Sequence, residues 1–216
     1  MGIATGAKYL DRIQDDREVW LGGKRVDNVT THPALKRGAA SMASLLDRQH
    51  DKKLSDCLTY SEPASDERFA MSFLPPKSTT DVIRRGAAFY DWAKWSNGMM
   101  GRTPDYLNSS FMAFAGAADY FAECRPQFSD NVRNYYTTMR DQDIVLTHTL
   151  VNPQVNRHLT AQGVASPEVA LRVVKETDAG IVVKGARLLA TLGPLSDEIA
   201  VFPSTVLKAA SEMKPY

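Results

Sequence analysis

Apolar residues in the first two thirds of the chain recur three and four positions apart, which is the spacing of one face of an α-helix. This spacing predicts helices over residues 2–14, from Pro33 through Leu46, from Ser78 to Gly98, from Pro104 to Phe114 and over 130–141. Gly22 and Gly23 stand between short apolar flanks, a pattern typical of a hairpin over 19–26. The polar run 47–56 and the region around Pro63 are expected to be loops.

Near residue 143 the pattern changes to short strands. The apolar and β-branched composition predicts a strand over 144–149, a hairpin over 171–184 with its turn at 177–180, and two further strands over 185–192 and 198–202. We therefore expect an α+β chain, with a helical N-terminal domain over residues 1–142 and the start of an antiparallel β domain over 143–216. So few strands leave an exposed sheet edge, so this β domain is expected to be incomplete. Either a partner covers that edge or the chain is a fragment of a longer protein.

Composition narrows the class of protein. The 216 residues are 44% hydrophobic, and 26 basic against 25 acidic side chains give a formal net charge of +1. Such a balance gives no electrostatic footprint for nucleic acid or for an anionic membrane. The sequence has no apolar run of the roughly 18 to 20 residues that span a bilayer, and its N-terminus does not resemble an export signal. Cys57 and Cys124 cannot form a dense disulfide framework, so a reduced, cytoplasmic protein is expected.

Familiar cofactor and nucleophile motifs are missing from the sequence. It contains no GxGxxG, no GxxxxGK[ST] and no GxSxG, which argues against a dinucleotide turn, a P-loop and a nucleophile elbow. The two cysteines lie far apart without a CxxC spacing, so we expect no zinc or iron–sulfur site and no other metal in this chain.

Two segments carry candidate chemistry. His148 lies between two threonines in a strand that is otherwise apolar, where an imidazole needs a partner; it is either a satisfied core histidine or a functional one. The segment Gly101–Tyr106 (GRTPDY) sets an arginine, a helix-starting proline and a tyrosine at a predicted helix N-terminus, a natural position for binding an anion. Taken by itself, this segment is more typical of an N-terminal capping turn than of a binding site.

These segments together resemble one family. Gly101–Tyr106, Thr147–Arg157 (THTLVNPQVNR), and Glu176–Arg187 with Ala190–Thr191 are similar to segments of the 4-hydroxyphenylacetate 3-monooxygenase large (oxygenase) component family, in the same order and at similar spacing. Thr5–Gly6, Val19–Trp20 and Val29–Pro33 resemble the start of that family. The resemblance implies an acyl-CoA-dehydrogenase-like fold, with a helical N-terminal domain, a central β domain and a C-terminal helical bundle. Complete members are longer, so the bundle is expected to be absent from this chain.

The resemblance also implies an activity, that of a two-component flavin monooxygenase of aromatic catabolism. A separate flavin reductase would supply FAD in its reduced form (FADH2). With O2, one oxygen atom would be transferred to the ring carbon ortho to the hydroxyl of a phenolic small molecule, giving a catechol. The leading substrate is 4-hydroxyphenylacetate. The complete protein is expected to be a homo-oligomer, a tetramer or a dimer, with no nucleic-acid or membrane partner.

The family's phenol-contacting residues fall on Arg102, Tyr106 and His148, which are the catalytic and substrate-binding candidates. The residue types suit the chemistry, because a permanent guanidinium charge favours phenolate, a tyrosine hydroxyl donates or accepts at the same oxygen, and an imidazole takes a proton near neutral pH. An electron-rich phenolate is in turn the better nucleophile toward an electrophilic oxygen.

Further residues are implied for the cofactor and for the rest of the substrate. The FAD contacts fall on His148, Gln154, Val155, Asn156, Arg157 and Thr191. Ser204 and Thr205 are candidates for binding the polar tail of the substrate. Two simpler interpretations remain open, since Asn152–Pro153 is a turn signal and Thr191 fits an ordinary strand residue.

Two alternatives to this activity are compatible with the same fold. The first is a truncated, non-catalytic remnant or assembly module of the same fold; the completeness of the Arg102, Tyr106 and His148 set argues against decay. The second is an enzyme like 4-hydroxybutyryl-CoA dehydratase, which carries an iron–sulfur cluster with cysteine ligands near the RTPDY-equivalent region. The stretch Trp95–Tyr106 contains no cysteine, which disfavours this alternative.

Overall fold

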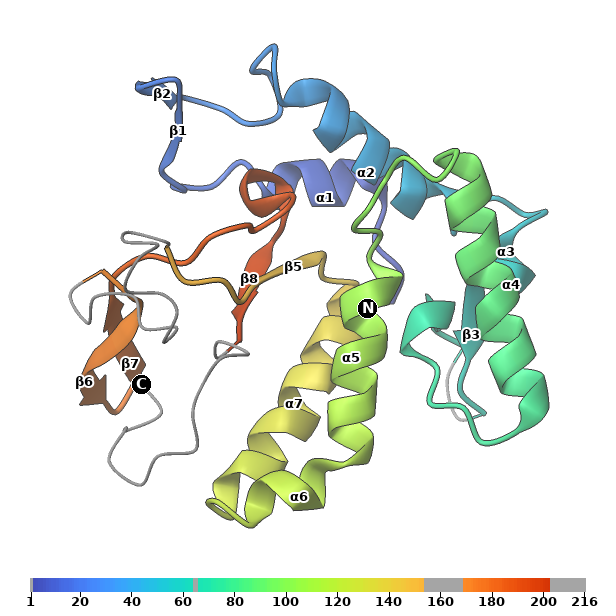
Figure 1. The fold of residues 1–216 in the computed structure, drawn as a ribbon. Coiled ribbons are helices and arrows are strands. Elements are labelled where there is room, and N and C mark those ends of the chain that lie inside the picture. Colours follow the sequence, from blue (N-terminus) through green and yellow to red (C-terminus); the bar gives the residue numbers. More distant parts are fainter. Residues whose placement is uncertain (1, 64–65, 154–168, 203–216) are drawn as a thin grey trace. The chain divides into compact units, whose positions relative to one another are not determined.

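The computed structural model describes residues 2–63, 66–153 and 169–202 and divides into two compact units. The first unit comprises Met1–Leu146 with Pro194–Glu198, and the second comprises Thr147–Gly193 with Ile199–Tyr216 (Figure 1). Among the described helices, none combines the length and the apolar character needed to cross a lipid bilayer.

The first unit is mainly helical. Its helices are α1 (Gly6–Arg12), α2 (Lys36–Arg48), α3 (Ser55–Leu58), α4 (Thr79–Trp95), α5 (Asp105–Gly116), α6 (Ala118–Ala122) and α7 (Gln127–Gln142). Its short strands are β1 (Val19–Leu21), β2 (Lys24–Val26), β3 (Thr59–Ser61) and β4 (Arg68–Ala70), and a 3-10 turn covers Met71–Phe73. The pairs β1–β2 and β3–β4 are antiparallel, and the first is the hairpin predicted from Gly22 and Gly23, which both adopt positive φ.

The first two predicted helices begin later than expected. α1 starts at Gly6 rather than at residue 2, because the Thr5 side chain caps the helix by accepting a hydrogen bond from the Lys8 N–H (3.2 Å). The N–H of Ile3 instead donates to the carbonyl oxygen of Arg68 (2.9 Å). α2 starts at Lys36, so Pro33 lies in the preceding turn and not in the first turn of the helix. The predicted loop 47–56 is also shorter, since α2 runs to Arg48 and α3 begins at Ser55.

Helices α4, α5 and α7 are close to their predicted positions. The Ser78 hydroxyl caps α4 by accepting from the Asp81 N–H (3.2 Å), and α5 follows directly on Pro104. α5 and α7 lie side by side and are joined through the short helix α6 (Figure 1). Aromatic rings fill their contact: Phe111 packs edge-on against Tyr135 at a centroid distance of 5.0 Å. The sequence pattern did not predict α6, α3 or the pair β3–β4, all of which are too short to show a periodicity.

The N-terminal segment is hydrogen-bonded to the segment that precedes strand β8 (Glu198–Val201). We call the contact between Arg12 and Asp197, with the hydrogen bonds around it, the clasp. Arg12 binds the Asp197 carboxylate with two hydrogen bonds, Nε to Oδ1 at 2.8 Å and Nη2 to Oδ2 at 2.7 Å. The same guanidinium donates to the carbonyl oxygens of Gln142 (3.0 Å) and Asp143 (3.1 Å). The Asp197 carboxylate also accepts from the Val145 N–H (2.8 Å), and the Tyr9 hydroxyl donates to the Leu195 carbonyl oxygen (2.6 Å). Residues up to 186 positions apart in the sequence therefore form one partly buried polar cluster.

Strand β5 (Leu146–Thr149) pairs with β8. The N–H of Asp197 donates to the Val145 carbonyl oxygen and that of Phe202 to the Thr149 carbonyl oxygen, so both strands run in the same direction. The prediction of an antiparallel β domain is therefore wrong for this pair, because the long intervening segment supplies the crossover that parallel strands need. The hairpin β6 (Arg172–Thr177) and β7 (Gly180–Lys184) is antiparallel, as predicted.

The strand predicted over 185–192 does not form. Leu189 and Leu192 adopt left-handed backbone conformations with φ of 64° and 66°, which a continuous strand cannot contain. Two threonine side chains of β5 donate hydrogen bonds to carbonyl oxygens of this segment. The Thr147 hydroxyl donates to Thr191, and the Thr149 hydroxyl donates to Leu188 (2.6 Å). Backbone pairing in this segment is limited to isolated bridges at Ala186 and Leu188, and the two threonine side chains bind further carbonyl groups.

A pair of glycine substitutions tests the packing of α1 on α2. A Cβ atom at Gly6 would lie 2.5 Å from the Ala43 carbonyl oxygen, whereas a Cβ at Gly86, inside α4, would meet nothing within 4 Å. We expect Gly6→Ala to lower the free energy of unfolding by about 2 kcal/mol through overpacking. Gly86→Ala should raise it by about 0.5 to 1 kcal/mol, since alanine is the better helix former. Urea denaturation measures both values, and equal effects of the two substitutions would contradict the packing described here.

Candidate functional site

The loop between α4 and α5 brings Arg102 to the start of α5. Asn97 and Gly98, with φ of 51° and 69°, turn the chain after α4. Pro104, whose φ of −56° already suits a helix, then leads into α5 and places Asp105 and Tyr106 in its first turn. The local sequence therefore fixes a short, turned loop that ends in a helix N-terminus.

Arg102 and Tyr106 lie against each other at this helix start. The guanidinium carbon of Arg102 lies 5.3 Å from the centroid of the Tyr106 ring, a cation–π distance. Nη1 donates to the Gly101 carbonyl oxygen (2.8 Å), and Nε is buried with no hydrogen-bond partner among the described residues. The Tyr106 side chain is half exposed. The pair thus presents a fixed positive charge, an available N–H donor and an aromatic ring, which together suit a phenolate.

Asp105 stands between these two residues in the sequence and was not singled out there. Burial raises the pKa of its carboxyl group, an effect partly opposed by a hydrogen bond from Thr103 and by the charge of Arg85. Its Oδ1 is also buried and has no hydrogen-bond partner among the described residues. Burial depends on the tertiary fold, so the sequence offered no signal beyond the position of Asp105 inside the RTPDY motif.

His148 lies in β5, a strand whose four residues are all buried. Its ring is 6% exposed, and its centroid lies 6.1 Å from that of Phe202. The hydroxyls of Thr147 and Thr149 on either side of it are bonded to carbonyl groups, as described above. The strand on both sides of the imidazole is therefore held by side-chain hydrogen bonds.

The structure describes some of the candidate FAD-binding residues but not all of them. Thr191 is exposed in a turn, and its carbonyl oxygen accepts from Thr147. Gln154, Val155, Asn156 and Arg157 lie outside the described residues, as do the substrate candidates Ser204 and Thr205. Immediately before the first of these segments, Asn152 accepts a hydrogen bond from Arg187 Nη1.

Arg187 is a second residue that sequence reasoning did not identify as functional. Its Nε is buried and has no hydrogen-bond partner among the described residues. An unsatisfied guanidinium N–H beside the turn at Asn152 fits an acceptor-rich group, such as one carrying carbonyl or phosphate oxygens. The 35 residues that separate Arg187 from Asn152 hid this pairing in the sequence.

The structure brings together two of the three phenol-binding candidates. Arg102 and Tyr106 lie in the first unit, and His148 and Thr191 lie in the second.

Within the described ranges, no three histidine, cysteine, aspartate or glutamate side chains gather in a way that could hold a metal ion. Cys57 and Cys124 are free thiols.

Comparison with known proteins shows one family. The model of the 4-hydroxyphenylacetate 3-hydroxylase N-terminal region matches residues 5–216. The 4-hydroxyphenylacetate 3-monooxygenase oxygenase component of Thermus thermophilus is 48% identical over 209 residues, which are 96% of this chain and 42% of that protein. The chain therefore spans less than half the length of this curated relative.

Solved structures agree with the sequence comparison. A crystal structure described as the oxygenase component of 4-hydroxyphenylacetate 3-monooxygenase, complexed with FAD and 4-hydroxyphenylacetate, has a TM-score of 0.85 and 48% identity. The match covers 95% of this chain and 42% of that one. An archaeal 4-hydroxybutyryl-CoA dehydratase from N. maritimus has a TM-score of 0.78 at 15% identity, covering 95% of this chain and 41% of that one. This second likeness concerns the fold alone.

Proposed function

The chain belongs to the 4-hydroxyphenylacetate 3-hydroxylase family, and we propose on this basis that the protein is the oxygenase component of a two-component aromatic monooxygenase. It would hydroxylate a phenol, with 4-hydroxyphenylacetate as the first candidate, at the carbon ortho to the hydroxyl group. The observation that carries the proposal is the Arg102–Tyr106 pair, with its buried and available Nε, in a chain that also keeps the buried His148. The acyl-CoA-dehydrogenase-like architecture and a homo-oligomeric state belong to the same proposal.

Arg102 and Tyr106 would bind and orient the phenol. The guanidinium charge lowers the free energy of the phenolate relative to the phenol, because an adjacent positive charge favours the ionised form. The Arg102 Nε has no other partner among the described residues, so a hydrogen bond from it to the phenol oxygen would satisfy a buried donor rather than break an existing bond. His148 would take the phenol proton, the role for which an imidazole is suited near neutral pH.

The cofactor would be FAD, in the reduced form, delivered by a separate flavin reductase. His148, Thr191 and the segment Gln154–Arg157 would hold it, and Arg187 offers the unsatisfied donor that fits its oxygen-rich groups. Once bound, reduced FAD supplies the activation of O2, which no protein side chain provides. The buried strand β5 around His148 would contribute the other requirement of this chemistry, a site from which water is excluded.

Product formation tests the proposed function directly. The product of the complete reading frame is supplied with enzymatically reduced FAD, O2 and 4-hydroxyphenylacetate, and we expect 3,4-dihydroxyphenylacetate to appear. Hydrogen peroxide without a catechol would keep the flavin reaction and move the search to other phenols. Oxygen consumption no faster than that of free reduced FAD would reject the proposal in favour of the non-catalytic alternative.

A further inference from the structure

Arg85 is a buried guanidinium that carries no ion pair within the described part of the chain. It lies in the middle of α4 with 7% of its surface exposed. Nη1 donates to the carbonyl oxygens of Ser72 and Leu74, each at 2.7 Å, and more weakly to that of Met71. Burial lowers the pKa of Arg85, but a guanidinium stays protonated in proteins. The side chain is therefore a permanent charge that neutral acceptors solvate in place of water.

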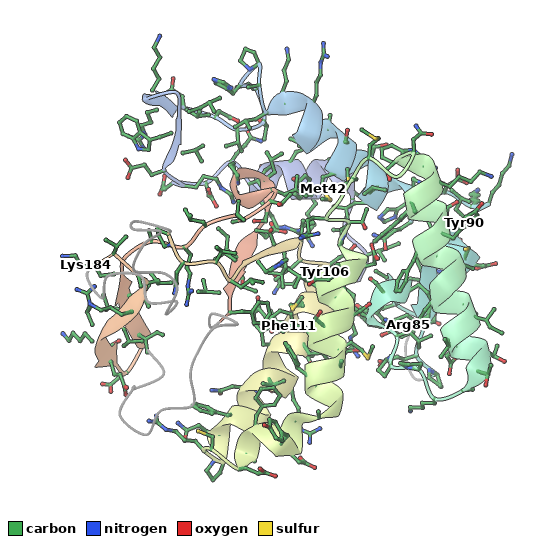
Figure 2. The ribbon with its side chains drawn as sticks, in the orientation of Figure 1. Met42, Arg85, Tyr90, Tyr106, Phe111 and Lys184 are labelled. Carbon is green, nitrogen blue, oxygen red and sulfur yellow. The ribbon has the colours of Figure 1, made fainter. Side chains whose placement is uncertain are left out.

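The other end of this guanidinium reaches α5. Nη2 donates to the Ser109 hydroxyl at 2.8 Å, and Figure 2 shows Arg85 on α4 together with Tyr106 on α5. Arg85 thus joins three elements: α4, the 3-10 turn Met71–Phe73 and α5. Burying a charge costs free energy that a pair of apolar side chains would not cost, so the contact is poorly explained by stability alone. The geometry of the contact is specific, because the planar guanidinium donates its hydrogen bonds in fixed directions.

A second contact links α5 to the same 3-10 turn. Asn108 is fully buried, and its Nδ2 donates to the Ser72 hydroxyl at 2.9 Å. Asn108 and Ser109 are adjacent on α5, so the two hydrogen bonds fix both the rotation of the helix about its axis and its position along that axis. Tyr106 lies one helical turn before Ser109, a spacing at which side chains are neighbours on the helix surface.

We propose that Arg85 and Asn108 are positioning residues, which set the first turns of α5 and thereby place Tyr106 and Arg102 for the phenol. The proposal rests on the proposed function. Neither residue touches the phenol; each acts through α5, which carries Tyr106 and directly follows the loop that holds Arg102. Placement matters here because an error of about 1 Å in a reacting geometry costs up to a hundredfold in rate.

The test removes only the contact between Arg85 and α5. Ser109→Ala deletes the hydroxyl that Arg85 binds and leaves the three carbonyl contacts of the guanidinium in place. The matched control is Ser96→Ala, directly after α4, whose hydroxyl donates to the nearby Ala93 carbonyl oxygen of α4 (3.2 Å). Ser109→Thr keeps a hydroxyl at the position and serves as the rescue, and Arg85→Lys keeps the charge while losing the fork.

We expect Ser109→Ala to raise the dissociation constant of 4-hydroxyphenylacetate about fivefold, the size of one modest hydrogen bond. The fraction of reduced FAD oxidised without hydroxylation should rise, and amide hydrogen exchange in 103–109 should become faster. The affinity for reduced FAD should stay within twofold. The free energy of unfolding should fall by only about 1 kcal/mol, the typical contribution of one hydrogen bond. Arg85→Lys should show the same changes more strongly, Ser109→Thr should revert them, and Ser96→Ala should show none.

Two results separate the inference from the function on which it rests. A wild-type protein that hydroxylates the phenol, together with a Ser109→Ala variant of unchanged phenol affinity and unchanged exchange, overturns the inference alone. A wild-type protein that neither binds nor hydroxylates any phenol offered overturns both. Equal loss of phenol affinity and of flavin affinity in Ser109→Ala would also reject a positioning role, because it would show general damage to the fold.

Discussion

Replacing Arg102 with methionine is expected to lower the rate of phenol hydroxylation by about a hundredfold or more, the loss typical of a charge partner placed at a reacting group. The substitution removes the guanidinium that lies over the Tyr106 ring and the buried Nε that has no other partner among the described residues. Without that charge the phenol ionises less readily, so the remaining activity should rise with pH in a range where the wild-type rate has levelled off.

The same loss is expected for His148→Asn, because a general base contributes a factor of about a hundred or more. The matched control is Arg133→Met, which removes an exposed arginine of α7 that forms an ion pair with the exposed Asp119. Steady-state kinetics of catechol formation, with peroxide release measured in parallel, gives both quantities. Near-normal catechol formation in both the Arg102 and the His148 variants would overturn these residue roles.

Breaking the clasp at Asp197 is expected to have the largest effect on stability. Asp197→Ala leaves Arg12 largely buried without its carboxylate and also removes the acceptor of the Val145 N–H. Losing one partner of such a pair lowers the free energy of unfolding by about 3 kcal/mol. The comparison is Asp119→Ala, which breaks an ion pair whose two side chains are both more than half exposed, and should cost less than about 0.5 kcal/mol. Equal urea midpoints for the two variants would show that the clasp adds no stability.

The helices that the sequence predicted well are those that begin at a capping or helix-starting residue. Ser78 supplies a capping hydroxyl and Pro104 suits a helix start, so the first residues of α4 and α5 were predicted to within one residue, whereas α4 ends at Trp95, three residues before the predicted Gly98. The hairpin at Gly22 and Gly23 was predictable for the same reason. The pattern of apolar and polar residues predicted the wrong structure where contacts with distant residues determine the backbone conformation. The segment 185–192 has the composition of a strand, but threonine hydroxyls of β5 bind its carbonyl groups, and the chain there takes left-handed turns.

The candidate site divides along the same line. Arg102, Tyr106 and His148 belong to segments that resemble a family, so they were named from the sequence, and the structure brings Arg102 and Tyr106 into contact. Asp105, Arg85 and Arg187 were not named. The role of Asp105 depends on its burial. Arg85 and Arg187 bind partners 24 and 35 positions away in the sequence, and a local sequence pattern does not contain such distant partners. The roles of all six residues stay predictions, and the substitutions above test those of Arg102, His148 and Arg85.

The clasp between Arg12 and Asp197 also constrains when the protein can reach its native state during synthesis. These residues are 185 positions apart, so α1 leaves the ribosome long before the carboxylate that anchors it exists. At translation rates of about 5 to 20 residues per second, that interval is roughly 10 to 40 seconds. During it, α1 can already pack on α2, but Arg12 lacks the carboxylate that it binds in the native state. The packing of the N-terminal helix and its anchoring by an ion pair are therefore separate events during synthesis.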